Sequence, residues 1–424
     1  MAAIDADPAR NRAARDSALS EPTTLVGPRW STWWSLAALG MYVAYYGAQQ
    51  IVLPRQSNAI TSNSAEAVSA QAWANVGAAV VTIVVSVLVG AFSDRTTYRR
   101  GRRQAWVLGG ALVLGVALIL QGQASSVWLL VLLWSLAQVG VAATYSALTA
   151  AVADEVPVRQ RARISSLLGI SQSVGPLVGI ALVTTVFLDI TWAYTALGLV
   201  AFLLALPFAF GTRGIALQKT ERQPLNLKIL LLGILSPLKH RDFAWAWGGR
   251  FFIQLSNALG QLYLYQFLQD RVHFDPDLGT LILIVVYALS TVIACIPAGR
   301  ISDRTGRRKR MVFIASVLQG VAGLFFMFLP TLAGAIIGAA VLGLGYGAYI
   351  AVDQALITQV LPNAEDRGKD LGVINIANTV PYVLAAALGG LVINEFGGYF
   401  VLYFLVLVTG VLAALTVRPI RSVR

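Results

Sequence analysis

Two oppositely charged residues, Arg250 and Asp353, fall inside long apolar segments of a 424-residue chain. An ionisable group at the bilayer centre costs about 2.5–3.5 kcal/mol on insertion scales, so it usually has a function or a partner. Apolar surroundings favour the protonated form of Asp353, whereas a nearby arginine favours its carboxylate. A carboxylate that moves between these environments can take up and release a proton. We therefore expect Asp353 and Arg250 to act as a coupling pair, in which proton binding to Asp353 is linked to the loss of its contact with Arg250. Two other interpretations stay open: a static ion pair that fixes helix packing, or an Asp353 among the lipid headgroups.

Amides and phenols are also concentrated in certain apolar segments. They offer hydrogen-bond donors and acceptors without charge, and aromatic faces suit C–H surfaces, so together they suit a neutral, hydroxylated small-molecule substrate. For any single residue, hydrogen bonding between helices, worth about 0.6 kcal/mol per bond, is the simpler explanation. As a set, they favour a polar cavity. The candidate substrate-binding residues are Tyr45, Gln49, Gln138, Tyr145, Asn257, Gln261, Tyr349, Asn375 and Asn378.

The residues that usually support catalysis or metal binding are scarce. The single cysteine, Cys295, lies in an apolar segment, and the two histidines, His240 and His273, are far apart. We find no nucleophile–base set and no metal-ligand spacing. The sequence therefore predicts no enzyme, no metal site and no cofactor, with a proton as the coupling ion.

A pattern of glycine, acid and arginine occurs twice, as Gly90-Ala-Phe-Ser93-Asp94-Arg95-Thr96 and as Gly299-Arg-Ile-Ser302-Asp303-Arg304-Thr305, and each copy runs into a Gly-Arg-Arg. The carboxylate can bind a guanidinium or the N–H groups at a helix start, and the glycine lets another helix approach. Ordinary basic loops would explain the arginines but not the repeated acid and glycine. We therefore expect gating loops that contain Gly90, Asp94, Arg95, Gly101, Arg102, Arg103, Gly299, Asp303, Arg304, Gly306, Arg307 and Arg308.

The elements that position these residues are predicted to be membrane-spanning helices. Hydrophobic residues make up 57% of the chain and charged residues only 12%, far less charge than a soluble domain carries. Apolar runs of spanning length predict helices, not the short alternating strands of an outer-membrane barrel. Twelve spans fit: 30–53, 72–93, 105–122, 126–153, 163–188, 192–211, 241–268, 279–300, 310–330, 332–358, 370–394 and 398–417.

The charge distribution predicts the topology. The net charge is +12, and nearly all lysines and arginines fall on one side of the expected spans; Arg55, Arg250 and Arg271 are the exceptions. This positive-inside bias predicts a multi-pass protein of the cell membrane with both termini in the cytoplasm. The basic residues are spread over short loops without a nucleic-acid reading module, so we expect no nucleic-acid partner.

Several landmarks recur in the same order in both halves of the chain. Pro157 and Pro362 each follow a span, where proline ends a helix, and Pro176 and Pro381 recur inside the following spans. Such repetition indicates a duplicated unit, and two similar halves suit alternating access in a transporter. We expect a disordered tail at 1–29, a six-helix bundle at 30–211, a cytoplasmic linker at 212–240, a second six-helix bundle at 241–417 and a tail at 418–424.

The twelve spans and the duplicated Gly-x-x-Ser-Asp-Arg loop resemble the major facilitator superfamily over roughly residues 30–417. The long first loop, Ser93-Asp94-Arg95-Thr96 with Gly101-Arg102-Arg103 and Trp106, resembles the glycoside–pentoside–hexuronide cation symporters and the sucrose–proton symporters. Two further stretches are similar to bacterial relatives of the sucrose group: Tyr349-Ile-Ala-Val-Asp353-Gln-Ala-Leu and Lys369-Asp370-Leu-Gly-Val-Ile-Asn375-Ile-Ala-Asn378. The resemblance implies alternating access, a site between the halves on spans 1, 4, 7 and 10, and cation-driven sugar or glycoside import.

The sequence also departs from related groups. The arginine of drug–proton antiporters is missing from span 4, which reads Ser135-Leu-Ala-Gln138-Val-Gly140. However, Gly175-Pro176-Leu-Val-Gly179 partly resembles the antiporter motif of span 5. Acids of the sodium-coupled symporters are missing from spans 2 and 4, which favours a proton. The main expectation is a proton-coupled sugar or glycoside symporter in which a monomer suffices; the alternative is proton-driven efflux of a small amphipathic compound.

Overall fold

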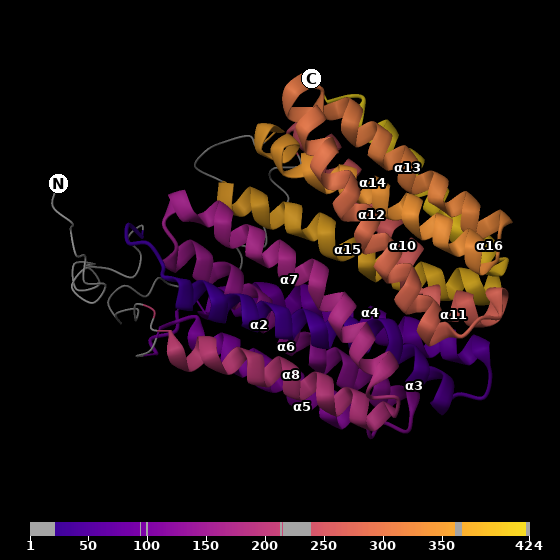
Figure 1. Cartoon of the computed structure of the whole chain (residues 1–424), viewed down its shortest axis with the longest axis horizontal. Helices are drawn as coiled ribbons and strands as arrows, with labels where there is room; N and C mark the ends of the chain where they lie inside the picture. Colours follow the sequence, from indigo (N-terminus) through magenta and orange to yellow (C-terminus); the bar gives the residue numbers. More distant parts are fainter. Residues whose placement is uncertain are drawn as a thin grey trace. The chain divides into compact units, whose positions relative to one another are not determined.

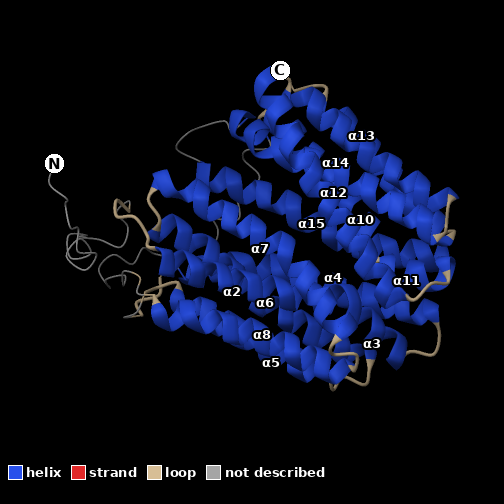
Figure 2. Ribbon diagram, viewed as in Figure 1, coloured by secondary structure: helices blue, strands red, loops and turns tan. Residues whose placement is uncertain are grey.

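The computed structural model describes residues 22–93, 95–98, 101–212, 214, 239–360 and 367–420. Figures 1 and 2 show that every regular element in these ranges is a helix, which confirms the expected all-α class. The first half of the chain contains α2 (Pro28–Gly47), the π-helical turn η1 (Ala48–Val52), α3 (Leu53–Ile60), α4 (Ser64–Ser93), α5 (Gln104–Gln121), α6 (Val127–Glu155), α7 (Val158–Thr185) and α8 (Ile190–Gly211). The second half contains α10 (Arg241–Leu262), α11 (Leu264–Phe267), the π-helical turn η4 (Leu268–Val272), α12 (Pro276–Thr305), α13 (Arg308–Phe328), α14 (Leu332–Val360), α15 (Arg367–Glu395) and α16 (Gly398–Val417).

Ten helices in the described part of the chain are long and apolar enough to cross a membrane. The other two expected spans correspond to α10 and α15. Helix α10 is less apolar because it carries Arg250 and several amides, and α15 contributes the shorter apolar stretch Val380–Glu395. Each of the twelve expected spans therefore has a helix, and the protein is an all-α, multi-pass membrane protein.

Some helix ends differ from the expected spans. The first span was expected at 30–53, but its helices run from Pro28 to Ile60, and the second starts at Ser64 instead of residue 72. The extra residues are polar, and Gln56 and Ser57 are 2% and 0% exposed. Because their polar groups are shielded by protein, they extend the helices in a way that hydropathy does not reveal.

The chain folds into two compact units. Unit 1 contains Met1–Gln49, Val84–Ala124 and Leu132–Leu225, and unit 2 contains Gln50–Ile83, Ser125–Val131 and Asn226–Arg424. Most of the expected linker at 212–240 lies outside the described residues. The expected boundaries of tails, bundles and linker therefore stay predictions.

The same helix pairings occur in each unit. In unit 1, α2 packs against α7 and α8, and α5 packs against α8; in unit 2, α10 packs against α15 and α16, and α13 packs against α16. If the twelve spans are numbered in chain order, span 1 packs against spans 5 and 6, and span 3 packs against span 6. In the second half, span 7 packs against spans 11 and 12, and span 9 packs against span 12, which is the same pattern shifted by six spans. The duplication in the sequence is thus also a duplication in packing.

Glycines let the paired helices approach closely at matching places. A Cβ on Gly198 of α8 would collide with the backbone of Gly115 in α5, and a Cβ on Gly410 of α16 would collide with Gly320 in α13. These two contacts join spans 3 and 6 and spans 9 and 12. Small residues at membrane helix interfaces permit this close backbone packing, so each unit has a glycine contact at the same helix pair.

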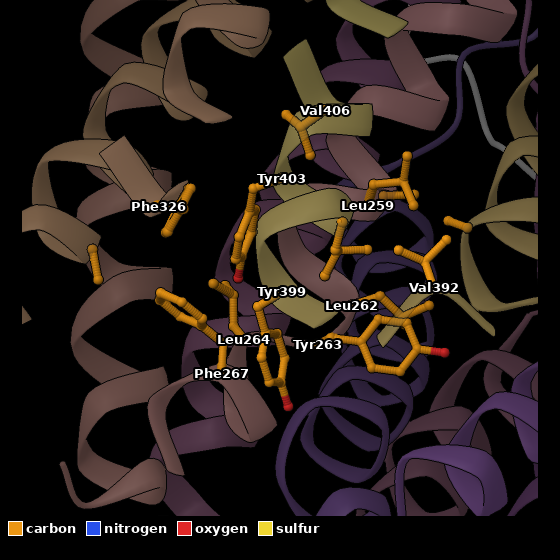
Figure 3. Close-up of a cluster of buried hydrophobic side chains, with 14 of the residues drawn as sticks. Leu259, Leu262, Tyr263, Leu264, Phe267, Phe326, Val392, Tyr399, Tyr403 and Val406 are labelled. Carbon is orange, nitrogen blue, oxygen red and sulfur yellow. The ribbon is translucent and has the colours of Figure 1, made fainter. Parts of the chain in front are cut away.

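An aromatic cluster closes one end of unit 2. Figure 3 shows Phe267, Phe326 and Tyr403 close together within this buried core. The rings of Phe326 and Tyr403 stack with centroids 4.6 Å apart, and Phe267 meets Tyr403 edge-on at 4.9 Å. Such offset and edge-to-face contacts are favoured by the ring quadrupoles. They hold the short helix α11 against α13 and α16, and so fix the end of the broken seventh span.

Candidate functional site

Arg250 and Asp353 form a buried ion pair in unit 2. Arg250 lies in α10 and Asp353 in α14, and the Arg250 Nη2 atom is 3.0 Å from the Asp353 Oδ2 atom. The side chains are only 9% and 7% exposed. Burial of either charge alone would be costly, so each makes the other tolerable. The structure brings the two candidate coupling residues together, and their role in coupling stays a prediction.

Aromatic and amide side chains surround this pair. Tyr349 precedes Asp353 by one turn of α14 and lies beside its carboxylate. Tyr346 hydrogen bonds to Gln254, which follows Arg250 by one turn of α10, and its ring centroid is 6.2 Å from that of Tyr349. The Nε of Arg250 is buried without a hydrogen-bond partner among the described residues. The guanidinium therefore keeps a donor available beyond its ion pair.

Asn257 is the centre of a second polar group, one helical turn further along α10 than Gln254. Its Oδ1 accepts hydrogen bonds from the Tyr287 hydroxyl of α12 at 3.0 Å and from Gln261 Nε2 at 3.1 Å. Tyr382 of α15 also hydrogen bonds to the Asn257 side chain. We call these four residues the Asn257 cluster. It joins three helices by uncharged hydrogen bonds, and the Tyr287 ring stacks on Tyr346 beside the ion pair, with centroids 6.2 Å apart.

The sequence predictions found part of this arrangement. Asn257, Gln261 and Tyr349 were candidate binding residues, whereas Gln254, Tyr287 and Tyr382 were not. Tyr287 and Tyr382 lie on spans 8 and 11, and a single tyrosine in an apolar span gives no signal of the direction in which it points. Gln254 carried a signal, because it is spaced by four residues from Arg250 and so shares its helix face.

The candidate residues of unit 1 are two tyrosines and two amides. The rings of Tyr45 and Trp134 stack nearly parallel, with centroids 6.2 Å apart. Gln49 follows Tyr45 by four residues and Gln138 follows Trp134 by four, and both amides are buried at 7% and 5% exposure. Tyr145 differs from them because it is 42% exposed. Trp134 was not among the candidates, since a tryptophan within an apolar run is indistinguishable from core.

Gln49 lies in the π-helical turn η1. This turn leads directly into α3, whose second residue is Pro54. Proline lacks an N–H group and disturbs the hydrogen bonds of the preceding turn. Single π-helical turns inside longer helices frequently occur at functional sites. The proline thus gives a local reason for the irregular backbone at this candidate residue.

The first gating loop forms a charged clamp at the end of α6. Arg102 contacts Asp154 through Nε at 2.9 Å and Nη2 at 2.7 Å, and the Nε of Arg103 donates to the same carboxylate at 2.6 Å. Arg103 also donates to the hydroxyl of Ser93. Gly101 has a φ of +121°, which strongly favours glycine, and this explains the glycine of the motif. We call Arg102, Arg103 and Asp154 the Asp154 clamp.

A neighbouring set of hydrogen bonds extends this clamp within unit 1. Glu155 accepts from Gln104 Nε2 at 2.9 Å and from the indole of Trp30 at 2.6 Å. The start of α2, the start of α5 and the end of α6 are therefore held together at the basic ends of the helices. Asp154 and Glu155 come shortly before Pro157 in the sequence, but the sequence did not predict these partners.

The sequence of the second half does not repeat the acid of this clamp. Alignment of Pro157 with Pro362 places Gln359 opposite Asp154, so the carboxylate is missing from the second half. Gly306 ends α12 in a left-handed conformation with φ +65°, a common role of glycine at a helix C-terminus. The two loops are similar in sequence, but their arginines have different environments.

The other loop arginines have side chains that are at least partly exposed. They are Arg95, Arg304, Arg307 and Arg308. Asp94 lies outside the described residues, as do the side chains of Asp303, Asn375 and Asn378. The expected roles of these four residues therefore stay predictions.

The structure does not show the close helix approach that was expected at two of the loop glycines. Gly90 and Gly299 were expected to permit close approach of another helix. A Cβ on Gly90 would meet nothing within 4 Å among the described residues, and one on Gly299 would make an ordinary contact with the Cβ of Ala351 at 3.8 Å. Neither glycine is in close contact with another helix among the residues that the structure describes, so their part in the gating loops stays a prediction.

A further polar network in unit 2 was not predicted. Arg55 of α3 forms an ion pair with Asp277 of α12 at 2.9 Å. Asp270 accepts hydrogen bonds from the Ser64 hydroxyl at 2.7 Å and the Tyr399 hydroxyl at 2.6 Å. The ends of the first two spans are thus bound to second-half helices, at the ends opposite the arginine-rich loops. The signal in the sequence was Arg55 itself, one of the few basic residues off the basic side.

Comparison with solved structures shows a transporter fold. The chain is similar to a nucleoside transporter, NupG (TM-score 0.71, 10% identity, covering 92% of this chain and 99% of that one), and to a POT family transporter in complex with 5-aminolevulinic acid (0.73, 13%, 94% and 98%). It is also similar to a bacterial homologue of the human lysosomal transporter Spinster (0.65, 12%, 93% and 95%). A comparison with curated protein sequences finds no match.

The family model described as Major Facilitator Superfamily matches residues 35–281 and 246–423. These two matches together cover nearly the whole membrane region, and they agree with the repeated helix pairings of the two units. The twelve helices, the duplicated loops and the family match lead to one conclusion: this chain belongs to the Major Facilitator Superfamily of membrane transporters.

Proposed function

We propose that this transporter moves a neutral sugar or glycoside-like solute across the cell membrane together with a proton, by alternating access. The observation that carries the proposal is the buried Arg250–Asp353 pair, which is linked through aromatic and amide side chains to the Asn257 cluster. A proton carrier and a set of uncharged hydrogen-bonding groups thus lie on the same helices.

The buried pair suits proton coupling for a physical reason. Protonation of Asp353 removes its negative charge, so its ionic attraction to Arg250 is lost. Arg250 then remains as a buried cation and needs other acceptors. Gln254 lies one turn away on α10 and Tyr346 interacts with the pair, and a hydroxyl oxygen of a solute could serve in the same way. Proton binding and solute binding would therefore favour each other.

The Asn257 cluster suits a hydroxylated solute. Asn257, Gln261, Tyr287 and Tyr382 supply donors and acceptors without formal charge, and the tyrosine rings supply faces for C–H groups. In unit 1, Tyr45 with Trp134, together with the buried Gln49 and Gln138, supplies the same combination. The solved structures with this fold include transporters of nucleosides and of peptides. The fold therefore does not select a solute class, and the proposal depends on these side chains.

The cellular setting follows from the charge distribution. The basic loops favour the cytoplasmic side, which places both termini in the cytoplasm and the protein in the cell membrane. The transporter would act as a monomer, with the lipid bilayer and a small-molecule solute as its partners.

The test is uptake of radiolabelled sugars and glycosides into proteoliposomes under an imposed inward proton gradient. Wild-type protein should accumulate a substrate above equilibrium, and Asp353→Asn should lose accumulation while retaining solute exchange at equal pH. Glu395→Gln is the matched control, because Glu395 is an exposed carboxylate. Full gradient-driven accumulation by Asp353→Asn would exclude Asp353 as the coupling group.

Efflux of a small amphipathic compound is the second candidate, because Gly175-Pro176-Leu-Val-Gly179 partly resembles an antiporter motif. In the structure these glycines serve packing between α7 and α2, which suits either direction of transport. Overexpression would raise tolerance to a toxic compound if efflux is the function. Accumulation of that compound in everted vesicles, lost when the proton gradient is removed, would favour efflux over import.

A further inference from the structure

The start of α13 and the end of α16 line an open hollow that the transport proposal does not use. It has a volume of about 310 Å³ and is lined by Lys309, Arg310, Phe313, Val417 and Arg418. It lies at the arginine-rich ends of these helices, directly after the second gating loop. A hollow lined by three cations and two apolar side chains has the mixed character of a site for an amphipathic anion.

The positions of two of the cations are fixed by contacts. Lys309 donates from Nζ to the carbonyl oxygens of Arg418 at 3.0 Å and Ile420 at 2.5 Å. These bonds tie the C-terminal end of α16 to the start of α13 and satisfy carbonyls left free at a helix end. The guanidinium of Arg418 lies over the Phe313 ring, with Cζ 5.0 Å from the centroid. A guanidinium stacked in this way keeps its in-plane N–H groups available.

The charges of Arg310 and Arg418 lack a carboxylate partner among the residues that the structure describes. Both side chains are exposed, and the guanidinium of Arg418 contacts the Phe313 ring. Two arginines at one hollow repel each other, and an anion bound there would relieve the repulsion. Phosphate is a good match because it accepts paired hydrogen bonds from guanidinium groups.

The apolar surroundings favour a lipid over a soluble phosphate. Ile314 follows Arg310 by four residues on α13 and is 41% exposed, while Leu415 and Val411 precede Arg418 by three and seven residues on α16 and are 44% and 41% exposed. Each helix therefore continues from a cation into exposed apolar surface on the same face. An acyl chain can follow that surface, whereas inorganic phosphate gains nothing from it.

We propose that this hollow binds the phosphate headgroup of an anionic glycerophospholipid in the leaflet that contacts the basic loops. Basic pockets between membrane helices on the cytoplasmic side are suited to anionic lipid headgroups. Such a lipid would hold the start of α13, and with it the second gating loop, in a fixed position. The sequence has Gln359 where the first half has Asp154, and the lipid would supply an anion from outside the protein.

The test is native mass spectrometry of the full-length protein released from detergent after titration with phosphatidylglycerol or phosphatidylcholine. Wild-type protein should retain one phosphatidylglycerol more tightly than any phosphatidylcholine. Because each basic residue near a membrane surface contributes about 1 kcal/mol to attraction of anionic lipid, Arg310→Gln/Arg418→Gln should weaken this binding roughly 10- to 30-fold. Arg310→Gln alone, at an exposed position, should give an intermediate loss without any risk to folding.

The matched control is Arg29→Gln/Arg300→Gln, which removes two exposed arginines outside the hollow. This variant should keep the tightly bound lipid. Equal loss in both double variants would overturn the proposal, because the effect would then be one of general charge. Equal retention of phosphatidylcholine would overturn it too. Displacement of the lipid by millimolar inorganic phosphate, with equal stabilisation of the protein by phosphate alone, would assign the hollow to a soluble anion instead.

Discussion

At the scale of single residues, the Arg250–Asp353 pair can be explained as a structural ion pair or as a coupling pair. The two explanations require different properties of the two side chains. A structural pair must only be neutral as a whole, because an unpaired buried charge is what destabilises the protein. A coupling pair must contain a group that gains and loses a proton. Stability and transport therefore respond differently to the loss of one charge and to the loss of both.

We predict that Arg250→Gln and Asp353→Asn each lower stability by about 3–5 kcal/mol, because each leaves one buried charge without its partner. The double variant should regain most of that loss, since no charge is left unpaired. Thermal unfolding of the purified protein in detergent measures this. The double variant should nevertheless remain unable to accumulate solute in proteoliposomes. If it accumulates solute normally, the pair serves packing alone.

The sequence was sufficient to identify both members of this pair, because a charge within an apolar span is rare enough to be informative. It was not sufficient for their neighbours. Tyr287 and Tyr382 could be recognised only after the fold showed which way α12 and α15 face. Trp134 was missed for a similar reason: an aromatic residue in an apolar run predicts burial, and burial does not distinguish a binding surface from a core.

At the scale of elements, the two gating loops show how a repeat in sequence can diverge in structure. Both loops have a glycine with positive φ at the turn, Gly101 and Gly306. Only the first has an acid at the end of the following even-numbered span, where Asp154 binds Arg102 and Arg103. The predicted role of the arginines depended on an acid in the same loop, but the described contacts involve an acid from another helix.

The contact between α2 and α7 depends on Gly179. A Cβ at this position would collide with the carbonyl oxygen of Val43 and approach the Gly47 nitrogen to 3.0 Å. Backbone atoms cannot move aside as a flexible side chain can. The small residues at this helix pair are therefore a requirement of packing.

We predict that Gly179→Ala destabilises the protein by about 1–3 kcal/mol, because the two helices must move apart to admit a methyl group. Gly169→Ala on the same helix is the control, since a Cβ there meets nothing within 4 Å. It should be neutral or slightly stabilising, as alanine is the better helix former. Thermal unfolding of both variants checks this, and equal effects would show that the α2–α7 contact is not tight.

At the scale of the whole molecule, the fold was largely predictable and the contacts at the helix ends were not. Hydropathy and the basic loops located all twelve spans, and the repeated prolines indicated the duplication that the helix pairings show. Hydropathy also ended the first span too early and began the second too late. Several polar residues in these extensions, including Asn58, Ser64 and Ser69, hydrogen bond to second-half residues. Single-sequence patterns carry no information about such partners.

These helix ends lead to a prediction about the transport cycle. Asn394 of α15 donates from Nδ2 to the Ser69 hydroxyl of α4 at 2.7 Å and to the Ala65 carbonyl at 3.0 Å. Alternating access requires such contacts between first-half and second-half helices to break in part of the cycle. Because the chain has one cysteine, Cys295→Ser provides a background in which only introduced thiols react.

In this background we expect the two introduced thiols of Ser69→Cys/Asn394→Cys to be joined by a short thiol-specific cross-linker that binds each cysteine through a disulfide bond. Cross-linking should abolish gradient-driven uptake into proteoliposomes, because the two helix ends can no longer separate, and a reductant should restore it. Each single-cysteine variant, treated in the same way, should retain uptake and so controls for modification of one thiol. Full uptake by the cross-linked protein would mean that α4 and α15 stay together throughout the cycle, and that the opening occurs elsewhere.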